Sequence, residues 1–332
     1  MSPIKDVAIR NFKSLREVGI GDCRRVNLFI GGMGSGKTNL LEALSLFAVD
    51  RAYSDFFTFV RYECGKKNLF SLFFDGDGSR PIEVTVNGNT EMLGKLDFRE
   101  EEYRLDFSSE FASFTVPGND TVVGDWKLSK TAPGGGYLSE VKRYGYGISP
   151  YNLVSYMDKS IPDGFHLNYL RGFPEVAEEI RGLFKEFAGA ELYYNVGDEH
   201  YFLFKWMKDD GSAFVMPYKN APESLLRLVF YKMAMKINKN CILLFEEPET
   251  GLGSECLMRL AADMYSLEEC GNQLFATTKS YFLVEELWGR LGEEGMSVYL
   301  TERERWTGET VVRKLRGEEV HQYNAEINEL NK

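Results

Sequence analysis

The chain has 332 residues, of which 44% are hydrophobic and 27% charged, so it is long enough to bury a sizeable core. Its formal net charge of −11 argues against a nucleic-acid binder that works through a protein-wide basic field, although DNA contact through the basic residues near the N-terminus stays an open alternative. Five scattered cysteines without a C-x-x-C pair, no signal-peptide pattern and no membrane-length apolar run lead us to expect a cytoplasmic protein without a membrane segment.

The N-terminal region predicts two strands, then a third strand, a loop and a helix. Residues 4–12 alternate apolar and polar side chains, and residues 16–20 would return beside them as a hairpin. An apolar run at 25–30 precedes the octet Gly31-Gly-Met-Gly-Ser-Gly-Lys-Thr38, and apolar residues at helical spacing follow it. Strand, glycine loop and helix is the context that the phosphate-binding pattern G-x-x-x-x-G-K-[ST] requires.

The octet predicts a binding site for a nucleoside triphosphate. Glycines let backbone N–H groups close around phosphate oxygens, and the helix that follows presents its positive end to the anion. Lys37 would reach the β- and γ-phosphates, and the Thr38 hydroxyl would ligate Mg²⁺. A glycine-rich turn without a ligand is the alternative, and the complete pattern in its proper context disfavours it. The remaining expected contacts come from Gly32, Gly34, Ser35, Gly36 and Asn39.

The middle of the chain predicts a small antiparallel β-subdomain and an irregular insertion. The expected strands are Leu69–Phe74, Pro81–Val86, Tyr103–Phe107 and Ala112–Val116, with turn sequences between them. Residues 117–165 are rich in Gly, Tyr and Pro and have no sustained periodicity. We expect an irregular segment there, serving either as a contact surface or as a packed loop.

The last third of the chain alternates helices and strands, which is typical of a parallel sheet covered by helices. An amphipathic helix is expected at 174–187, and a helix that is apolar nearly all round at 222–237. The continuous apolar run at 241–245 predicts a strand buried on both faces. The other expected strands are 191–195, 201–208, 213–217, 273–277, 297–301 and 310–315, and the other helices are 254–270, 281–291 and a polar terminal helix.

The buried strand at 241–245 ends in two carboxylates, Glu246 and Glu247, which has the form of a Walker B element. Glu246 would hold Mg²⁺, and Glu247 would orient and deprotonate an attacking water. An acidic surface turn is the alternative, and the phosphate loop upstream makes it the weaker one.

These motifs resemble ABC-type ATPase heads of the family that includes RecF, SMC proteins and OLD-like ATPases. The resemblance rests on Ile9-Arg-Asn-Phe-Lys-Ser14, Gly31–Leu41, Phe245-Glu-Glu-Pro-Glu-Thr-Gly-Leu252 and Gln273-Leu-Phe-Ala-Thr-Thr-Lys-Ser280. It implies an α/β P-loop NTPase with a mainly parallel sheet, an N-terminal antiparallel β-subdomain and the irregular insertion. A single domain over 1–332 is then expected, with one lobe at 1–116, a middle region at 117–220 and a second lobe at 221–332. The resemblance also implies nucleotide contacts from Lys13 and Ser224.

Two departures from the family pattern bear on the chemistry. The signature-like segment Ala221–Arg227 has Pro222 in place of a serine and Ser224 in place of a glycine, and the switch position holds Lys279 rather than histidine. In the family, the signature of one subunit caps the γ-phosphate bound to the other, and the switch residue contacts that phosphate. Lys279 is thus expected to act with Glu247 as a catalytic residue, with slow turnover because a lysine cannot relay a proton near neutral pH. No Q-loop glutamine is identifiable, and Asn68 is a weak candidate.

The resemblance implies an ATPase that forms a homodimer or larger homo-oligomer around ATP and acts as a sensor or regulator. Stand-alone proteins of this kind often belong to mobile-element or antiphage defence systems, with a separate effector such as a nuclease or toxin. The alternative is a nucleotide-dependent scaffold that hydrolyses ATP negligibly and assembles a partner protein. The altered signature and Lys279 favour the scaffold, whereas the Glu246–Glu247 pair opposes it.

Overall fold

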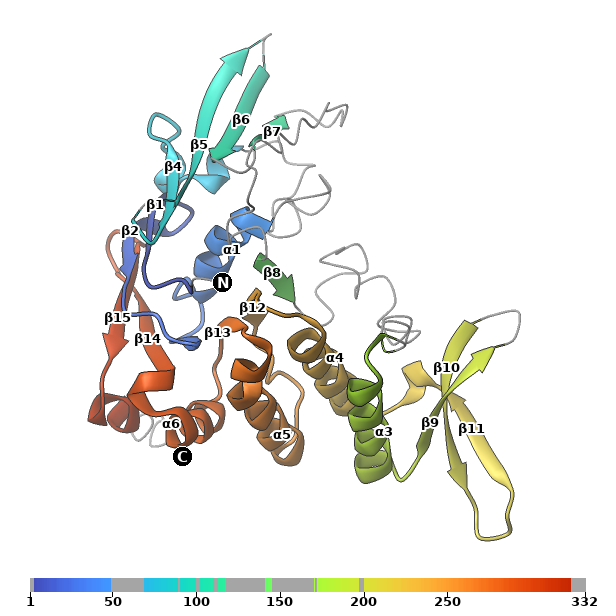
Figure 1. Cartoon of the computed structure of the whole chain (residues 1–332). Coiled ribbons are helices and arrows are strands. Elements are labelled where there is room, and N and C mark those ends of the chain that lie inside the picture. The colour runs from blue at the N-terminus through green and yellow to red at the C-terminus, as the bar shows by residue number, and fades with distance from the viewer. Residues whose placement is uncertain are drawn as a thin grey trace.

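The computed structural model describes residues 3–48, 69–88, 90–99, 102–109, 113–117, 141–144, 170, 172–196 and 200–323. Its centre is a six-stranded sheet in the order β15-β14-β3-β13-β12-β8 (Figure 1). All neighbouring strands in it are parallel except β14 and β15, which confirms the expected mainly parallel sheet. Its strands are β3 (Val26–Ile30), β8 (Val141–Tyr144), β12 (Ile242–Glu246), β13 (Gln273–Thr277), β14 (Met296–Arg303) and β15 (Thr310–Leu315).

The central sheet separates two hydrophobic cores, as expected of strands that are apolar on both faces. In β3, Leu28 and Ile30 belong to one core and Phe29 to the other. The first core lies under helices α3, α4, α5 and α6, and the second lies under α1 and the N-terminal sheet. The helices are α1 (Lys37–Ser45), α3 (Pro174–Ala188), α4 (Glu223–Ile237), α5 (Ser254–Tyr265) and α6 (Tyr281–Gly295), and a further helical turn covers 318–323.

A second six-stranded sheet forms the predicted antiparallel β-subdomain, in the order β2-β1-β4-β5-β6-β7. The expected N-terminal hairpin is its β1–β2 pair, and β5 was not predicted. Its strands are β1 (Val7–Phe12), β2 (Leu15–Ile20), β4 (Ile82–Val86), β5 (Thr90–Arg99), β6 (Glu102–Ser109) and β7 (Ser113–Pro117).

The strand predicted at Leu69–Phe74 is wrong, because this segment forms 3-10 turns instead. The buried residues Leu69, Leu72 and Phe73 recur at the spacing of a helical turn rather than of a strand. Asp75, at φ 51°, then turns the chain, so that Phe73 makes only a single bridge to Phe12. The 3-10 helices of the described chain are η1 (Leu46–Ala48), η3 (Leu69–Leu72), η4 (Phe74–Gly76), η7 (Tyr218–Asn220) and η8 (Ser266–Cys270).

The segment expected to be irregular contributes one strand to the central sheet. Within 117–165 the structure describes Pro117 and residues 141–144, and the latter form β8, parallel to β12 at the edge of the sheet. Lys142 and Tyr144 fix β8 from either side of Arg143, because both side chains hydrogen-bond to Asn238 at the end of α4. The remaining residues of that segment, and Asn68, lie outside the described part of the chain.

A third sheet projects beyond α3 on the side away from the N-terminal sheet (Figure 1). It consists of β9 (Glu191–Val196), β10 (His200–Met207) and β11 (Ala213–Pro217), all antiparallel. Phe204 of β10 packs against Phe184 of α3, which ties this sheet to the first core. Among the described residues, no helix is both long enough and apolar enough to cross a membrane.

Asn272 fixes the start of the Walker B strand. Its amide donates to the Met235 and Asn238 carbonyls at 2.9 and 2.8 Å, and its oxygen accepts from the Cys241 N–H at 2.9 Å. These bonds join the end of α4 to the beginnings of β12 and β13. The Asn272 side chain is fully buried, so water could not replace it as the hydrogen-bond partner of these backbone groups.

We predict that Asn272→Ala lowers the free energy of unfolding by about 1–3 kcal/mol, because buried groups on two elements lose their partner. Urea denaturation monitored by circular dichroism measures the change. The control is Lys239→Ala, at an exposed position nearby, which should change stability by less than about 0.5 kcal/mol. Equal stability of both variants would contradict the structural role of Asn272.

Candidate functional site

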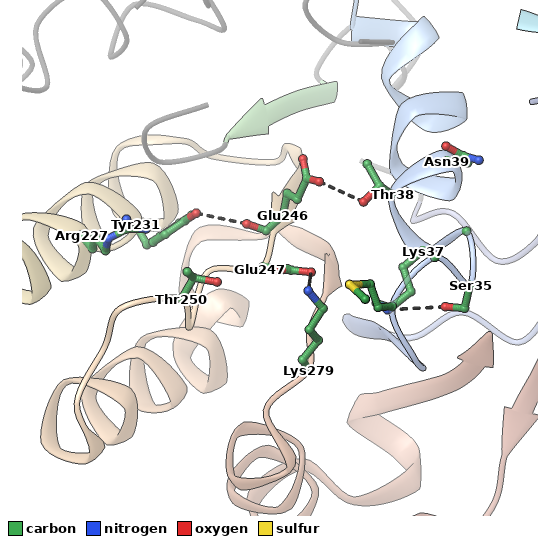
Figure 2. A pocket seen from close by; sticks show the side chains of 13 residues that line it. Ser35, Lys37, Thr38, Asn39, Arg227, Tyr231, Glu246, Glu247, Thr250 and Lys279 are labelled. Atoms are coloured by element: carbon green, nitrogen blue, oxygen red, sulfur yellow. Dashed lines mark hydrogen bonds and ion pairs between the residues drawn. The ribbon is translucent and has the colours of Figure 1, made fainter. Parts of the chain in front are cut away.

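A cavity of about 570 Å³ opens at the carboxyl ends of β3 and β12, between α1 and α4. Ligands of open α/β sheets bind at this edge. The side chains of Thr38, Glu246, Glu247 and Lys279 converge there although they come from opposite ends of the sequence (Figure 2). The lining residues are Met33, Gly34, Ser35, Gly36, Lys37, Thr38, Asn39, Arg227, Tyr231, Glu246, Glu247, Thr250 and Lys279.

The glycine loop has the backbone that its sequence demands. Gly31 and Gly36 have φ values of 143° and 94°, which favour glycine, and a Cβ on either residue would overlap atoms of Thr301 or Thr310. Gly36 is the N-cap of α1 and has no side chain to satisfy the first N–H groups of the helix. These N–H groups are therefore available to an anion in the loop.

Lys37 lies over the loop and is almost fully buried. Its ammonium donates to the carbonyls of Gly31 and Gly32 at 2.6 and 2.7 Å. Burial lowers the Lys37 pKa, and the Lys279 charge adds to this, while Glu247 and Glu249 oppose it. An anion beside the ammonium would restore the stability of its charged form.

The glycine loop and the acidic end of β12 are joined directly by a hydrogen bond. Thr38 donates to Glu246 Oε1 at 2.9 Å, across 208 positions of sequence. The other oxygen of the carboxylate, Oε2, accepts from Arg143 Nη2 of β8 at 2.9 Å, and both side chains are buried. Tyr231 of α4 donates to the Glu246 carbonyl at 3.4 Å, so α1, β8 and α4 all contact this residue.

Glu247 follows with a left-handed backbone, at φ 41°, which is uncommon for a residue with a side chain. Its N–H donates to both the carbonyl and the hydroxyl of Thr277, which hold it in this conformation. Its carboxylate pairs with the Lys279 ammonium at 2.7 Å, and these side chains are 29% and 51% exposed. Lys279 thus pairs with the residue expected to act as the base.

Next to this pair, Glu249 is enclosed. Its Oε1 accepts from the Lys279 N–H at 2.7 Å. Within the described part of the chain, its buried Oε2 has no hydrogen-bond partner. Burial raises the Glu249 pKa, and the negative charge of Glu247 contributes to the same shift. The segment after β12 thus holds Lys279 by its backbone as well as by its ammonium.

Three of the residues expected to contact the nucleotide do not line the cavity. Lys13 pairs with the buried Glu42 of α1 at 2.6 Å. Gly32 is not among the lining residues, and its carbonyl accepts from Lys37. Ser224 lies in the first turn of α4. Asn39 does line the cavity, but its side chain points away from Glu246 and donates to Ser14 (Figure 2).

The structure adds residues that the sequence did not single out as site residues. Arg227 and Tyr231 line the cavity from α4, one helical turn apart, and Thr250 follows the two carboxylates. Arg227 and Tyr231 are one helical turn apart and lie on one face of α4, and this spacing in the sequence could have suggested both as site residues. Arg143 had no such signal, because it lies on a four-residue strand in a segment without periodicity.

The chain shares partial sequence similarity with RecF proteins. The DNA replication and repair protein RecF of Thermoanaerobacter sp. (strain X514) is 27% identical over 110 residues, which cover 28% of this chain and 30% of that protein. RecF of Leptospira biflexa is 25% identical over 146 residues, which cover 42% of this chain and 40% of that protein. The chain thus spans well under half the length of these curated relatives. No family model matches it.

Solved structures of SMC head domains share its fold. The SMC head domain of Thermotoga maritima superimposes with a TM-score of 0.52 at 13% identity, over 95% of this chain and 100% of that one. An SMC head bound to the C-winged helix domain of ScpA gives a TM-score of 0.55 at 13% identity, over 97% and 100% of the two chains. Partial sequence similarity to RecF proteins and the fold of SMC head domains together support the expected resemblance to ABC-type ATPase heads.

Proposed function

We propose that the chain binds ATP with Mg²⁺ in this cavity, dimerises around two ATP molecules, hydrolyses them slowly and transmits the change to a separate effector protein. The convergence of Lys37, Thr38, Glu246, Glu247 and Lys279 on one cavity carries the proposal. Each of these residues has the charge or hydrogen-bonding group that its role needs.

The phosphate and metal contacts follow from the geometry of the loop. The Lys37 ammonium, which now donates to two loop carbonyls, could donate instead to phosphate oxygens that lie in the loop. Thr38 and Glu246 would hold Mg²⁺, an ion that takes one or two carboxylates and completes its coordination with phosphate oxygens and water. When bound, Mg²⁺ would neutralise the charge that develops on the transferred phosphoryl group.

Glu247 would accept the proton of the attacking water. Its side chain is partly exposed, so water can reach it. The carboxylate pairs with Lys279, so an attacking water would compete with the ammonium for its oxygens, which supports slow turnover. Because both side chains are partly exposed, this effect is modest. A γ-phosphate would offer Lys279 a second anion, and movement of the lysine toward it would release the base.

Two further observations support dimerisation and a protein partner. Ser224 lies outside the lining of its own chain's cavity, as a residue that caps the nucleotide of a second chain would. One SMC head of the same fold is bound to ScpA, which supports a protein partner for this fold in general. We propose a nuclease or toxin as the effector, in mobile-element or antiphage defence, and the identity of the neighbouring genes tests this.

The scaffold alternative is favoured by a specific observation. Both carboxylates of the Walker B element pair with a cation of the chain, Glu246 with Arg143 and Glu247 with Lys279. A site with this arrangement could bind ATP and dimerise with negligible hydrolysis. A phosphate-release assay distinguishes the two functions, because only the ATPase produces phosphate above the buffer background.

The first prediction concerns binding. Lys37→Ala removes a charge-assisted contact worth about 1.5–3 kcal/mol, so ATP affinity should fall about tenfold or more. Isothermal titration calorimetry measures the affinity. Lys5→Ala, at an exposed position, serves as the control and should bind ATP like the wild type. Equal affinity of the Lys37 variant and the wild type would contradict the assignment of the loop.

The second prediction concerns hydrolysis. Glu247→Gln keeps the size of the side chain but removes the base, so phosphate release should fall about 10²–10⁴-fold while ATP stays bound. Light scattering should then show an ATP-dependent dimer. Glu285→Gln, at an exposed position of α6, is the matched control and should leave the rate unchanged. If Glu247→Gln hydrolyses ATP at the wild-type rate, Glu247 is not the base.

The third prediction concerns the switch position. Lys279→Ala should weaken ATP-dependent dimerisation and reduce the preference for ATP over ADP, because the γ-phosphate loses a cation. Lys279→His should keep dimerisation. Sedimentation velocity with each nucleotide measures both effects, with Lys239→Ala as the control. Normal ATP-dependent dimerisation of Lys279→Ala would show that the lysine pairs with Glu247 without contacting nucleotide.

A further inference from the structure

Arg143 bonds to the carboxylate oxygen of Glu246 that does not bond to Thr38. Its Nη2 lies 2.9 Å from Glu246 Oε2, and the two side chains are 5% and 8% exposed. With Thr38 on Oε1, both oxygens of the carboxylate are hydrogen-bonded within the chain. A charge-assisted bond of this length between buried groups is strong, and breaking it is costly.

The position of Arg143 is fixed by the sheet. It pairs in register with Leu244, and Tyr144 pairs with Phe245, immediately before Glu246. Tyr144 is fully buried, makes edge contacts with Phe230 and Phe245, and accepts a hydrogen bond from Asn238 at 2.7 Å. The backbone of β8 therefore holds the guanidinium beside the carboxylate, as part of the site's framework.

We propose that Arg143 is an internal cation that competes with Mg²⁺ for Glu246, so that nucleotide binding depends only weakly on Mg²⁺. The inference rests on the proposed ATP site and deepens it. A guanidinium on Oε2 takes the acceptor that a water bound to Mg²⁺ would use. It also places a positive charge next to the divalent ion, and in a buried site this repulsion is strongly felt.

In such a site Mg²⁺ would bind after the nucleotide. Nucleotide would bind through the glycine loop and Lys37 with little help from Mg²⁺. Full coordination of the metal by Glu246 would require the guanidinium to yield Oε2. The rate of ATP hydrolysis would then still rise with Mg²⁺ at concentrations where the affinity for nucleotide has stopped changing.

The test measures the affinity for AMP-PNP, an ATP analogue that is not hydrolysed, with the full chain in EDTA and in saturating Mg²⁺. The ratio of the two affinities is the coupling between nucleotide and metal. In the wild type we expect Mg²⁺ to raise the affinity by less than about tenfold, at the low end of usual coupling factors. A wild-type ratio above about a hundredfold would overturn the proposal without any variant.

Variants locate the effect at Arg143. Arg143→Gln keeps a donor for Glu246 but removes the charge, and the ratio should rise at least about tenfold above that of the wild type. Arg143→Lys keeps the charge and should stay close to the wild type. Lys142→Gln, on the same strand and bonded to Asn238 rather than Glu246, is the matched control. Thermal unfolding confirms that each variant is folded before its binding is measured.

Two failures can be told apart. If the wild type binds no AMP-PNP with or without Mg²⁺, the proposed ATP site is wrong. If it binds AMP-PNP and the folded Arg143→Gln variant has the same ratio as the wild type, the nucleotide site stands and the competition by Arg143 is refuted.

Discussion

The geometry of the candidate site depends on the hydrogen bonds of one group, the carboxylate of Glu246. It lies at the end of β12, where one oxygen accepts from Thr38 of α1 and the other from Arg143 of β8. Three elements that are far apart in the sequence are thereby fixed at one edge of the central sheet. The phosphate loop and the acidic segment after β12 face each other across a cavity because this residue connects them.

The two carboxylates at the end of β12 each pair with a cation of the chain. Glu246 pairs with Arg143, Glu247 pairs with Lys279, and the Lys37 ammonium donates to loop carbonyls. A triphosphate would add several negative charges and compete for Lys37 and Lys279, which line the cavity. ATP binding would therefore require these side chains to exchange partners, and the free-energy cost of that exchange supports slow hydrolysis. Because Glu247 and Lys279 are partly exposed, their pair is the easier one to exchange.

The sequence predicted the parts of the site that depend on local backbone. The glycine octet requires positive φ at defined positions, and the continuous apolar run before Glu246 is typical of a strand buried on both faces. The pairing of Lys279 with Glu247 and of Arg143 with Glu246 could not be predicted, because each depends on how distant segments pack. The strand expected at Leu69–Phe74 failed for a local reason, since its buried residues recur at helical rather than alternating spacing.

A crystal structure of the chain with AMP-PNP and Mg²⁺ tests the central claim most directly, namely that this cavity binds a nucleoside triphosphate. We predict phosphate density inside the glycine loop, with the Lys37 ammonium bonded to it in place of the Gly31 and Gly32 carbonyls. We also predict that Lys279 contacts the γ-phosphate and no longer pairs with Glu247. Nucleotide bound elsewhere, with Lys37 and Lys279 keeping the partners they have here, would contradict the account.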